Sequence, residues 1–578
     1  MGKILTVVVV FLGLLGCSNS VAPNESGNNA LSLTIANIDT TGVNILTSPI
    51  VSDPANDPYS VENMNKAMRR RVLAKSSVDS VEAEQMFLEP NFLYVRFLAE
   101  GREGVAKLKA YDTSLVLFKH PLDYNRIRKP VVYIDQTLPD SVYPFFATVP
   151  VDYKFGSTKY EIIKELFLVE PLDGDCKGDE CEEESDSSAT VNALFKRLKA
   201  KAGSPTLSKL KNLGISLNEI EWESLNMMGQ LETRMAAKKA TIEPTAVVAW
   251  SLFGGGKKLG GQLKFKDDQL GVQPLVGVRV VGGYSYYWRE AHTDINGKFK
   301  IPEKWTYKID FEVNFDSDDF LLEDGHSWYG EDLEIEHNNY KSDWNETFTG
   351  NKAKWCVVWT AAYQYWYGEN FGLKRPRQNK WWNWSLDIEV FYKNEKDYKN
   401  HYSSESIGEY AMFLSTESIG ILAYKKPSYS IYSTTIHEIA HASHYWNMKT
   451  TSAVTPQSGE FSLLPTAYKE TYARGIENYF VSKKYGAGYQ RRDYNNQYTG
   501  LVEDLQDEDD LSQCKKITDF DKRDKVSGFS IKNIETAFFQ NKKFSTMKNY
   551  LKKKNPAEKN GTKYTSTALD DLFTCWGL

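Results

Sequence analysis

The stretch His437-Glu438-Ile439-Ala440-His441-Ala442-Ser443-His444 decides how the rest of this chain is interpreted, because it holds three of the eight histidines among 578 residues. The preceding run, residues 429–436, lacks glycine and proline and offers hydroxyl side chains that cap helix starts. Small or apolar side chains recur around the histidines, as they do in a buried helix. The sequence therefore predicts a buried helix through residues 437–444.

The spacing of His437 and His441 predicts a metal site. Residues four apart lie on one face of a helix, so both imidazoles can bind the same ion. Glu438 follows the first histidine and projects beside the metal, where it can take a proton from water as a general base. The alternative is a surface helix with two unrelated histidines, which the apolar surroundings disfavour.

The histidine spacing resembles the zinc-binding motif of the zincin peptidases, and the residues that follow sort the branches of that superfamily. The metzincin pattern requires glycine at position 444 and histidine at position 447, whereas this chain has His444 and Asn447. The gluzincin branch implies a glutamate ligand on a second helix downstream, and catalytic zinc usually has three protein ligands and one open position. The resemblance therefore implies a Zn²⁺ cofactor in a mainly α-helical, zincin-like catalytic domain.

Residues 466–484 suit the glutamate helix, because apolar and aromatic side chains recur there at helical spacing. Glu470 lies 29 residues after His441 (470 − 441), and its Glu-Thr-Tyr-Ala context resembles the Glu-x-x-Ala of gluzincin ligand helices. We therefore expect Glu470 to be the third ligand. Glu477 shares its face and is the reserve ligand, a group that holds a ligand histidine, or a solvated helix charge.

Spacing alone does not assign two further side chains of the site. His444 lies one turn beyond His441 and either stands behind the ligands, faces the substrate, or is a plain packed histidine. The resemblance also implies a tyrosine or histidine that stabilises the transition state. Tyr468, Tyr472 and Tyr479 lie on or beside the glutamate helix, but none stands out in a chain with 34 tyrosines.

Residues 409–417 and 419–424 precede the metal helix and read as strands. In zincin peptidases such a strand lies at the edge of a sheet above the metal helix, where an extended peptide pairs with it. The resemblance therefore implies a protein or peptide substrate. The cluster Trp381-Trp382-Asn383-Trp384 offers rings that can stack on glycans, although core or interface packing is favoured.

The first 60 residues predict export. Lys3 precedes an apolar run that ends in Leu14-Leu15-Gly16-Cys17, which is too short for a membrane span and typical of a secretory signal peptide over residues 1–16. The ending resembles a bacterial lipobox, which implies cleavage before Cys17 and lipidation of that cysteine. The alternative is an ordinary signal peptide with an incidental cysteine. Residues 17–60 would be a flexible lipidated tether, and the protein would be anchored to a membrane of the bacterial cell envelope.

Composition excludes one class of partner and permits disulfides. The net charge is −6 and the pI is near 5.9, so no basic surface is available for nucleic acid. Five cysteines follow the lipobox. The candidate disulfides are Cys176–Cys181 and Cys514–Cys575, whereas Cys356 lies in an apolar run and is expected to be a buried thiol.

Shifts in composition predict a multidomain chain with an α+β region at its N-terminal end. This region spans residues 61–250. It should begin with a basic helix over residues 64–75, followed by strands such as 92–97 and 115–118.

Residues 259–315 resemble a carboxypeptidase regulatory-like domain, which is a small transthyretin-like β-sandwich. The alternation of Val276, Val278 and Val280 predicts a half-buried strand, and Gly297 can take positive φ in a turn between strands. The resemblance is carried by three runs: 261–266, 274–281 and 293–301. Such domains fold, space or bind, and carry no catalysis.

Two functional classes compete for the whole chain. The metal site would lie in residues 340–578, separated from the sandwich by a connector near residues 316–345. One class is a cell-envelope zinc metalloendopeptidase, and the other is a non-catalytic binding or adhesion lipoprotein with a peptidase-like domain. The enzyme is favoured by an intact set of ligands and base: His437, Glu438, His441 and Glu470.

Overall fold

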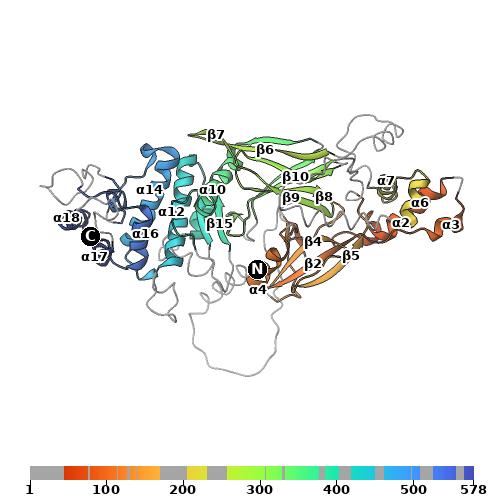
Figure 1. Cartoon of the computed structure of the whole chain (residues 1–578), viewed down its shortest axis with the longest axis horizontal. Helices are drawn as coiled ribbons and strands as arrows, with labels where there is room; N and C mark the ends of the chain where they lie inside the picture. The colour runs from red at the N-terminus through yellow and green to blue at the C-terminus, as the bar shows by residue number, and fades with distance from the viewer. Residues whose placement is uncertain are drawn as a thin grey trace, which may run out of the picture.

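The computed structural model describes residues 44–75, 78–113, 115–125, 131–139, 141–169, 205–230, 257–305, 308–327, 332–340, 342–376, 385–402, 418–448, 461–495, 497–507, 525–554 and 565–578. It shows a multidomain protein of mixed α and β structure. In Figure 1 a mainly helical region lies at one end of the long axis and the helices of an N-terminal module lie at the other, with the sheets between them. Among the described residues, no helix combines the length and apolar character needed to cross a membrane.

Several features predicted from the sequence lie outside the described residues. They are the signal peptide 1–16, Cys17, the pair Cys176 and Cys181, the tryptophan cluster 381–384, the strand 409–417 and Cys514. The predictions made for them stay predictions.

The N-terminal module combines an antiparallel sheet with a cluster of helices. The sheet has the order β4-β2-β5, from β2 (Phe92–Glu100), β4 (Val142–Pro150) and β5 (Lys159–Leu166). The expected strand over 115–118 is reduced to one bridge between Phe118 and Phe146. The helices are α2 (Val61–Leu73), α3 (Ser80–Gln85), α4 (Gly101–Tyr111), α6 (Pro205–Asn212) and α7 (Leu217–Met227). All of them except α4 contribute to one apolar core.

The expected tether is too long at its C-terminal end. Within residues 17–60, β1 (Asn44–Leu46) pairs in parallel with β3 (Val131–Tyr133). Asp57 and Tyr59 are also buried, and the Asp57 carboxylate accepts hydrogen bonds from Lys164 Nζ and Tyr286 Oη, each at 2.9 Å. Folded structure therefore begins before residue 60, because these side chains join the module to the sheets that follow.

Two sheets pack face to face in the middle of the molecule. One has the order β10-β6-β14 with β7 beside β6, and the other has the order β13-β11-β8-β9. Rings cross between them, with Phe311 5.8 Å from Phe299 and 5.9 Å from Trp344 between centres. The strands are β6 (Lys257–Asp267), β7 (Gly271–Pro274), β8 (Arg279–Tyr284), β9 (Tyr287–His292), β10 (Lys298–Trp305), β11 (Ile309–Asn314), β13 (Glu334–Tyr340) and β14 (Trp344–Phe348).

The expected end of this sandwich at residue 315 is wrong, because each sheet takes a further strand from beyond it. β13 and β14 lie in the segment expected to be a connector, and the boundary placed at 340 falls between them. β14 pairs in parallel with β6, a long-range pairing that local pattern does not reveal. The two-sheet unit therefore runs to residue 348.

The predicted half-burial of the valine strand is also wrong, whereas the predicted turn is confirmed. Val280 and Val281 are both fully buried, because the N-terminal module packs against the same sheet, with Phe92 6.0 Å from Tyr287 between ring centres. Gly297 has φ of 74°. Asp294 Oδ1 accepts the backbone N–H of Lys298 at 2.8 Å, which closes the turn into β10.

The mainly helical region contains a small parallel sheet of order β12-β15-β16. The strands are β12 (Phe320–Asp324), β15 (Leu386–Phe391) and β16 (Ser418–Leu422). Against it pack α10 (Gly350–Trp366), α11 (Glu395–Tyr402) and α12 (Ser428–Asn447). The next helix, α14 (Thr466–Tyr485), packs against α12 on the side away from the sheet (Figure 1). The short η5 (Ala487–Tyr489), α15 (Leu501–Asp504), α16 (Ile531–Gln540), α17 (Phe544–Lys554) and α18 (Ser566–Cys575) complete it.

The sandwich and the helical region share one continuous apolar core. The α10 helix joins them, since Trp359 Nε1 donates to the Val276 carbonyl at 2.9 Å. Gly277 has φ of 70° and lies against Tyr363, whose ring a Cβ at this position would meet at 1.9 Å. A sandwich packed this closely supports the helical region directly.

The cysteines of the helical region agree with the sequence where the structure describes them. Cys356 is a free, fully buried thiol, and burial raises its pKa well above the usual value. Cys575 is disulfide-bonded. Its expected pairing with Cys514 stays a prediction.

Candidate metal centre

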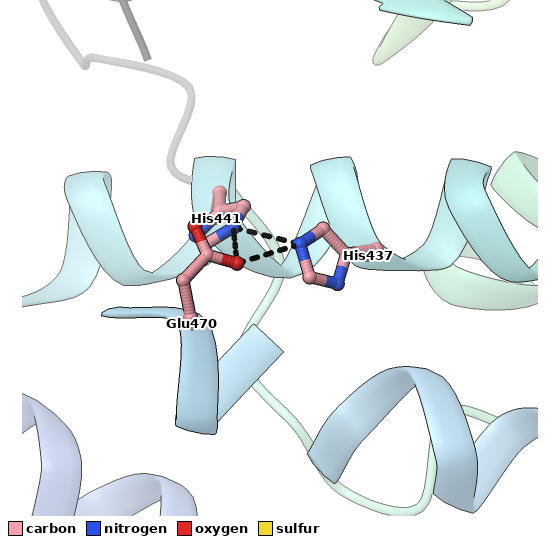
Figure 2. Close-up of side chains that lie close together, drawn as sticks. All are labelled: His437, His441 and Glu470. Atoms are coloured by element: carbon pink, nitrogen blue, oxygen red, sulfur yellow. Dashed lines mark hydrogen bonds and ion pairs between the residues drawn. The ribbon is translucent and has the colours of Figure 1, made fainter. Parts of the chain in front are cut away.

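Two packed helices bring three donor residues together. His437 and His441 lie one turn apart on α12, and Glu470 extends toward them from α14 (Figure 2). His437 Nε2 is 3.1 Å from Glu470 Oε2 and 3.0 Å from His441 Nε2, and His441 Nε2 is 3.5 Å from Glu470 Oε2. One potential ligand atom from each residue lies within 4.8 Å of the others, which is close enough for all three to bind one metal ion.

Burial gives this cluster the character of an ion site. His437, His441 and Glu470 are 5%, 0% and 2% exposed. Their donor atoms converge on each other, and buried nitrogen and oxygen atoms that face one another in this way need a shared proton or a cation. Glu470, which the sequence predicts as the third ligand, therefore lies close enough to share an ion with both histidines.

Glu477 lies behind His437 and contacts its outer nitrogen. The Nδ1–H of His437 donates to Glu477 Oε2 at 2.9 Å, so Nε2 is the ring nitrogen that faces Glu470. Ser433 also donates to the carboxylate, and Arg474 Nε is 3.3 Å from it. Of the three roles considered for Glu477, the geometry matches a group that holds a ligand histidine.

Burial and neighbouring charges shift the pKa values of Glu477 and His441. Burial alone would raise the pKa of Glu477, but the hydrogen bond with His437 and the charges of Arg474 and Arg491 outweigh it, so the pKa is lowered. Burial and the neighbouring histidines hold the pKa of His441 well below its usual value. A neutral imidazole is the form that binds metal.

The start of α12 differs from the expectation. The helix begins at Ser428, so the hydroxyl residues expected to cap it lie within its first turns. Its first N–H is satisfied instead by the sandwich, since Ser428 N donates to Asp268 Oδ2 at 3.2 Å and Asp268 N donates to Ser428 Oγ at 3.0 Å. The residue that caps the helix is Asp268, in the turn between β6 and β7. The residues just before Ser428 in the sequence therefore do not reveal this cap.

The same turn also holds the far end of α14. Tyr485 Oη donates to Asp267 Oδ2 at 2.7 Å, and Tyr489 Oη donates to Gln269 Oε1 at 2.9 Å. One turn of the sandwich therefore fixes both helices that carry the candidate ligands.

Glu438 follows His437 on α12 and is 5% exposed. It is thus a carboxylate on the helix that carries both histidine ligands, in a mostly dehydrated setting. Such a setting strengthens its interaction with a nearby cation.

Of the three roles considered for His444, the structure matches that of a plain packed histidine. It is completely buried, and neither ring nitrogen has a hydrogen-bond partner among the described residues. The rings around it belong to Phe461, Tyr468, Tyr472, Phe538 and Phe539. Burial, with a smaller effect of Lys469, lowers its pKa to about 3.

The three tyrosines named from the sequence are directed to other parts of the fold. Tyr468 Oη donates to the carbonyl groups of Phe538 and Asn541, and Tyr472 Oη donates to Glu535 at 3.1 Å. The ring of Tyr479 packs edge-on against Phe371. Their hydroxyl groups do not contact the metal ligands in any described interaction.

Sequence reasoning missed Tyr498, which lies beside the site. Its ring centre is 6.3 Å from that of His437. No local pattern distinguishes Tyr498, because it lies in a loop 61 residues after His437 (498 − 437) and reaches the site only through the fold of that loop.

The strand expected over 419–424 appears as β16, at one edge of the parallel sheet and shortly before α12. Its residues Ser418 to Gly420 are buried. The order β12-β15-β16 also includes β12, which comes from the segment expected to be a connector. The sheet therefore begins earlier in the chain than the predicted catalytic domain.

Comparisons with known proteins add no assignment. No protein-family description matches this chain, and no curated protein matches it. Among solved structures, (S)-allantoin synthase aligns with 29% of this chain and 57% of its own length, at 9% identity and a TM-score of 0.11. A likeness this slight indicates neither fold nor activity.

Proposed function

We propose that this protein is a zinc-dependent metalloendopeptidase that acts on protein or peptide substrates at the bacterial cell envelope. The observation that carries the proposal is the buried His437–His441–Glu470 cluster with Glu438 next to its first ligand. The envelope location rests on the lipobox-like ending at Cys17.

The donor set favours zinc among biological metals. Two imidazole nitrogens and one carboxylate oxygen form a ligand set of catalytic zinc that leaves a position open. Calcium and magnesium prefer oxygen ligands alone. The hydrogen bond from His437 to Glu477 adds the outer partner that ligand histidines commonly have.

The proposal includes the finer fold assignments. The two ligand helices support a gluzincin-type catalytic domain, and the two face-to-face sheets support a carboxypeptidase regulatory-like domain over the sandwich. The second assignment has to accommodate β13 and β14, which extend the sandwich beyond the segment that carries the resemblance.

The chain's own residues supply the proton transfer. Zinc held by His437, His441 and Glu470 would supply Lewis acidity, which would polarise a carbonyl and lower the pKa of water to about 7. Glu438 accepts a proton from the attacking water and passes it to the leaving amine. His437 is held in the tautomer that presents Nε2 to the metal by its bond to Glu477.

The test compares wild-type protein with Glu438→Gln in a proteome-derived peptide cleavage screen. Glutamine keeps the shape but cannot act as a base, so turnover should fall by roughly 10²- to 10⁴-fold while bound zinc stays near one per chain. Glu395→Gln, at an exposed position on α11, is the matched control and should cleave as wild type does.

Equal cleavage by wild type and Glu438→Gln would overturn the proposal. Absence of both cleavage and bound zinc in the wild type would leave the binding or adhesion lipoprotein as the better account.

A further inference from the structure

His326 lies in the turn after β12, at the carboxyl end of the parallel sheet β12-β15-β16. Its side chain is 5% exposed. The rings of Phe391 and Tyr392, where β15 ends, lie 5.6 and 5.2 Å from it between centres. A buried imidazole at this position needs hydrogen-bond partners for both of its nitrogens.

The end of β15 and the start of α11 supply these partners. The backbone N–H groups of Tyr392 and Lys393 donate to His326 Nε2 at 3.0 and 2.9 Å. His326 Nδ1 lies 2.6 Å from Asp397 Oδ2, in the first turn of α11. A backbone N–H can only donate, so Nε2 has to be an acceptor without a proton. The ring is therefore neutral in this arrangement, and its proton lies on Nδ1 and is donated to Asp397.

Asp324, the last residue of β12, brings a second carboxylate close to the same ring. Its Oδ1 accepts the backbone N–H of His326 at 2.9 Å. Its Oδ2 accepts hydrogen bonds from Tyr392 Oη at 2.8 Å and from Lys393 Nζ at 3.0 Å. Lys393 thus balances the charge of Asp324, and Asp397 is the carboxylate that contacts the imidazole itself.

Asp397 ties the imidazole to α11. Its Oδ2 also accepts from Asn394 Nδ2, and its backbone N–H donates to Asn394 Oδ1, each at 2.9 Å. The hydrogen bond with His326 is the largest of the effects that lower the pKa of Asp397, and the charge of Lys396 adds to them. Asp397 therefore stays ionised in the pH range where a histidine gains its proton.

The loop of residues 392–394 connects β15 to α11 and so holds the start of that helix. The α11 helix packs against β15 and β16. The ring of Tyr398 stands edge-on to Phe391 at 5.4 Å between centres, and Phe391 is fully buried. Release of the loop would free the start of α11 and uncover Phe391.

We propose that His326 is an acid-sensitive clasp, which holds α11 against the parallel sheet while the ring is neutral and releases it when Nε2 gains a proton. A protonated Nε2 is a donor that faces two N–H donors, so both of its hydrogen bonds are lost. The ion pair gained with Asp397 offsets little of this loss, because the Asp397 side chain is 41% exposed and water screens the attraction. The clasp opens as pH falls through the range where histidines titrate, roughly pH 7 to 5. It needs neither a metal ion nor peptidase activity.

The experiment measures hydrogen exchange over residues 392–402 of the full-length protein at about pH 7.5 and about pH 5, with rates corrected for the intrinsic effect of pH. His326→Gln keeps an amide oxygen that can accept from the loop, but it takes up no proton. His326→Leu removes the acceptor at both pH values. His292→Gln, at an exposed position on β9, is the matched control. Nitrogen NMR of the wild-type imidazoles reports whether Nε2 carries a proton.

In the wild type and in His292→Gln, protection over residues 392–402 should fall by roughly tenfold or more between the two pH values. His326→Gln should keep its protection at both, and His326→Leu should have weak protection at both. The imidazole signal that His326→Gln lacks should change from an unprotonated to a protonated Nε2 over the same interval.

Equal loss of protection in the wild type and in His326→Gln would overturn the proposal, because acid would then act through another group. So would a wild-type Nε2 that gains its proton while protection over residues 392–402 stays unchanged. If neither His326 variant folds, the exchange rates and nitrogen signals of the wild type still decide between an opening clasp and a fixed one.

Discussion

His441 and His444 lie one turn apart on α12 and are both fully buried, yet their surroundings are opposite in kind. His441 Nε2 faces His437 at 3.0 Å and Glu470 at 3.5 Å. His444 lies among aromatic rings, with Phe539 stacked on it at 5.3 Å. Burial is common to both, so the difference in chemistry comes from what the neighbouring helices present: a carboxylate in one case and rings in the other.

Because of these surroundings, the His441 imidazole can serve as a ligand and the His444 imidazole cannot. A buried donor atom is useful to a metal only where further donor atoms converge on it. Around His444 the described interactions are ring contacts, which provide no second ligand. The cost of its unsatisfied nitrogens falls on folding stability instead.

The largest expected effect is loss of the metal when His441, the histidine that faces Glu470, is removed. His441→Ala should abolish zinc binding at micromolar metal, because two remaining ligands do not form a stable site. His444→Leu should bind one zinc per chain as wild type does. Metal content after equilibrium dialysis checks both, and loss of zinc from His444→Leu would erase the distinction drawn here.

The second effect is a pH-dependent stability that belongs to His444. Its pKa is about 3 in the fold, against 6.5 for an ordinary histidine. Between these values the unfolded chain binds more protons than the folded one, so stability falls as pH drops from 6.5 toward 3 and is fully present above 6.5. At about 1.4 kcal/mol per pKa unit, the total is at most about 5 kcal/mol.

Urea unfolding of wild type and His444→Leu at pH 7 and pH 4.5 measures this effect. The wild type should lose about 2 to 3 kcal/mol more than the variant on this change of pH. Other titrating groups are common to both proteins, so the difference isolates His444. Parallel losses would show that His444 can gain a proton without leaving its aromatic surroundings.

The sequence could predict the cluster of His437, His441 and Glu470 but not the contrast with His444. His437, His441 and Glu470 were predictable because helical periodicity acts over a few residues, and the spacing of a known motif supplied the link between two helices. The rings around His444 come largely from α14 and α16, including Phe538 and Phe539, which follow it by more than 90 residues. Which helix covers which face is set by tertiary packing, and no local pattern in this chain records it.

The same limit applies to the fold. The helix over residues 466–484 and the Gly297 turn were predicted well, since they depend on neighbouring residues. The extent of the sandwich was not, because β14 pairs with β6 across some eighty residues of chain. The reciprocal hydrogen bonds between Asp268 and Ser428 were missed for the same reason, because these residues are far apart in the sequence.

The third effect concerns Glu477, the carboxylate that accepts a hydrogen bond from the outer nitrogen of His437. Glu477→Gln should reduce zinc affinity by roughly 10- to 100-fold, because the neutral amide holds the His437 Nδ1–H less strongly. Glu535→Gln is the control, since that buried carboxylate accepts hydrogen bonds from Tyr472 and from the backbone of Lys374. Competition with a zinc chelator gives both affinities, and equal affinities in the two variants would rule out the role of Glu477.

The smallest effect tests a carboxylate that acts on α12 from outside the metal centre. Asp268 accepts the first N–H of the helix at Ser428, so Asp268→Ala should cost about 1 kcal/mol of stability, as loss of a helix cap does. Zinc affinity should stay within about twofold, because Ser428 lies nine residues before His437 (437 − 428), and a continuous helix transmits little of a disturbance at its end. Asp294→Ala is the control, in a sandwich turn that closes on its own backbone. Unfolding and zinc titration of the three proteins give the result. A large loss of zinc affinity in Asp268→Ala would mean that the sandwich itself sets the geometry of the ligands. The contacts of His441 at the metal centre would then depend on the turn that holds the start of α12.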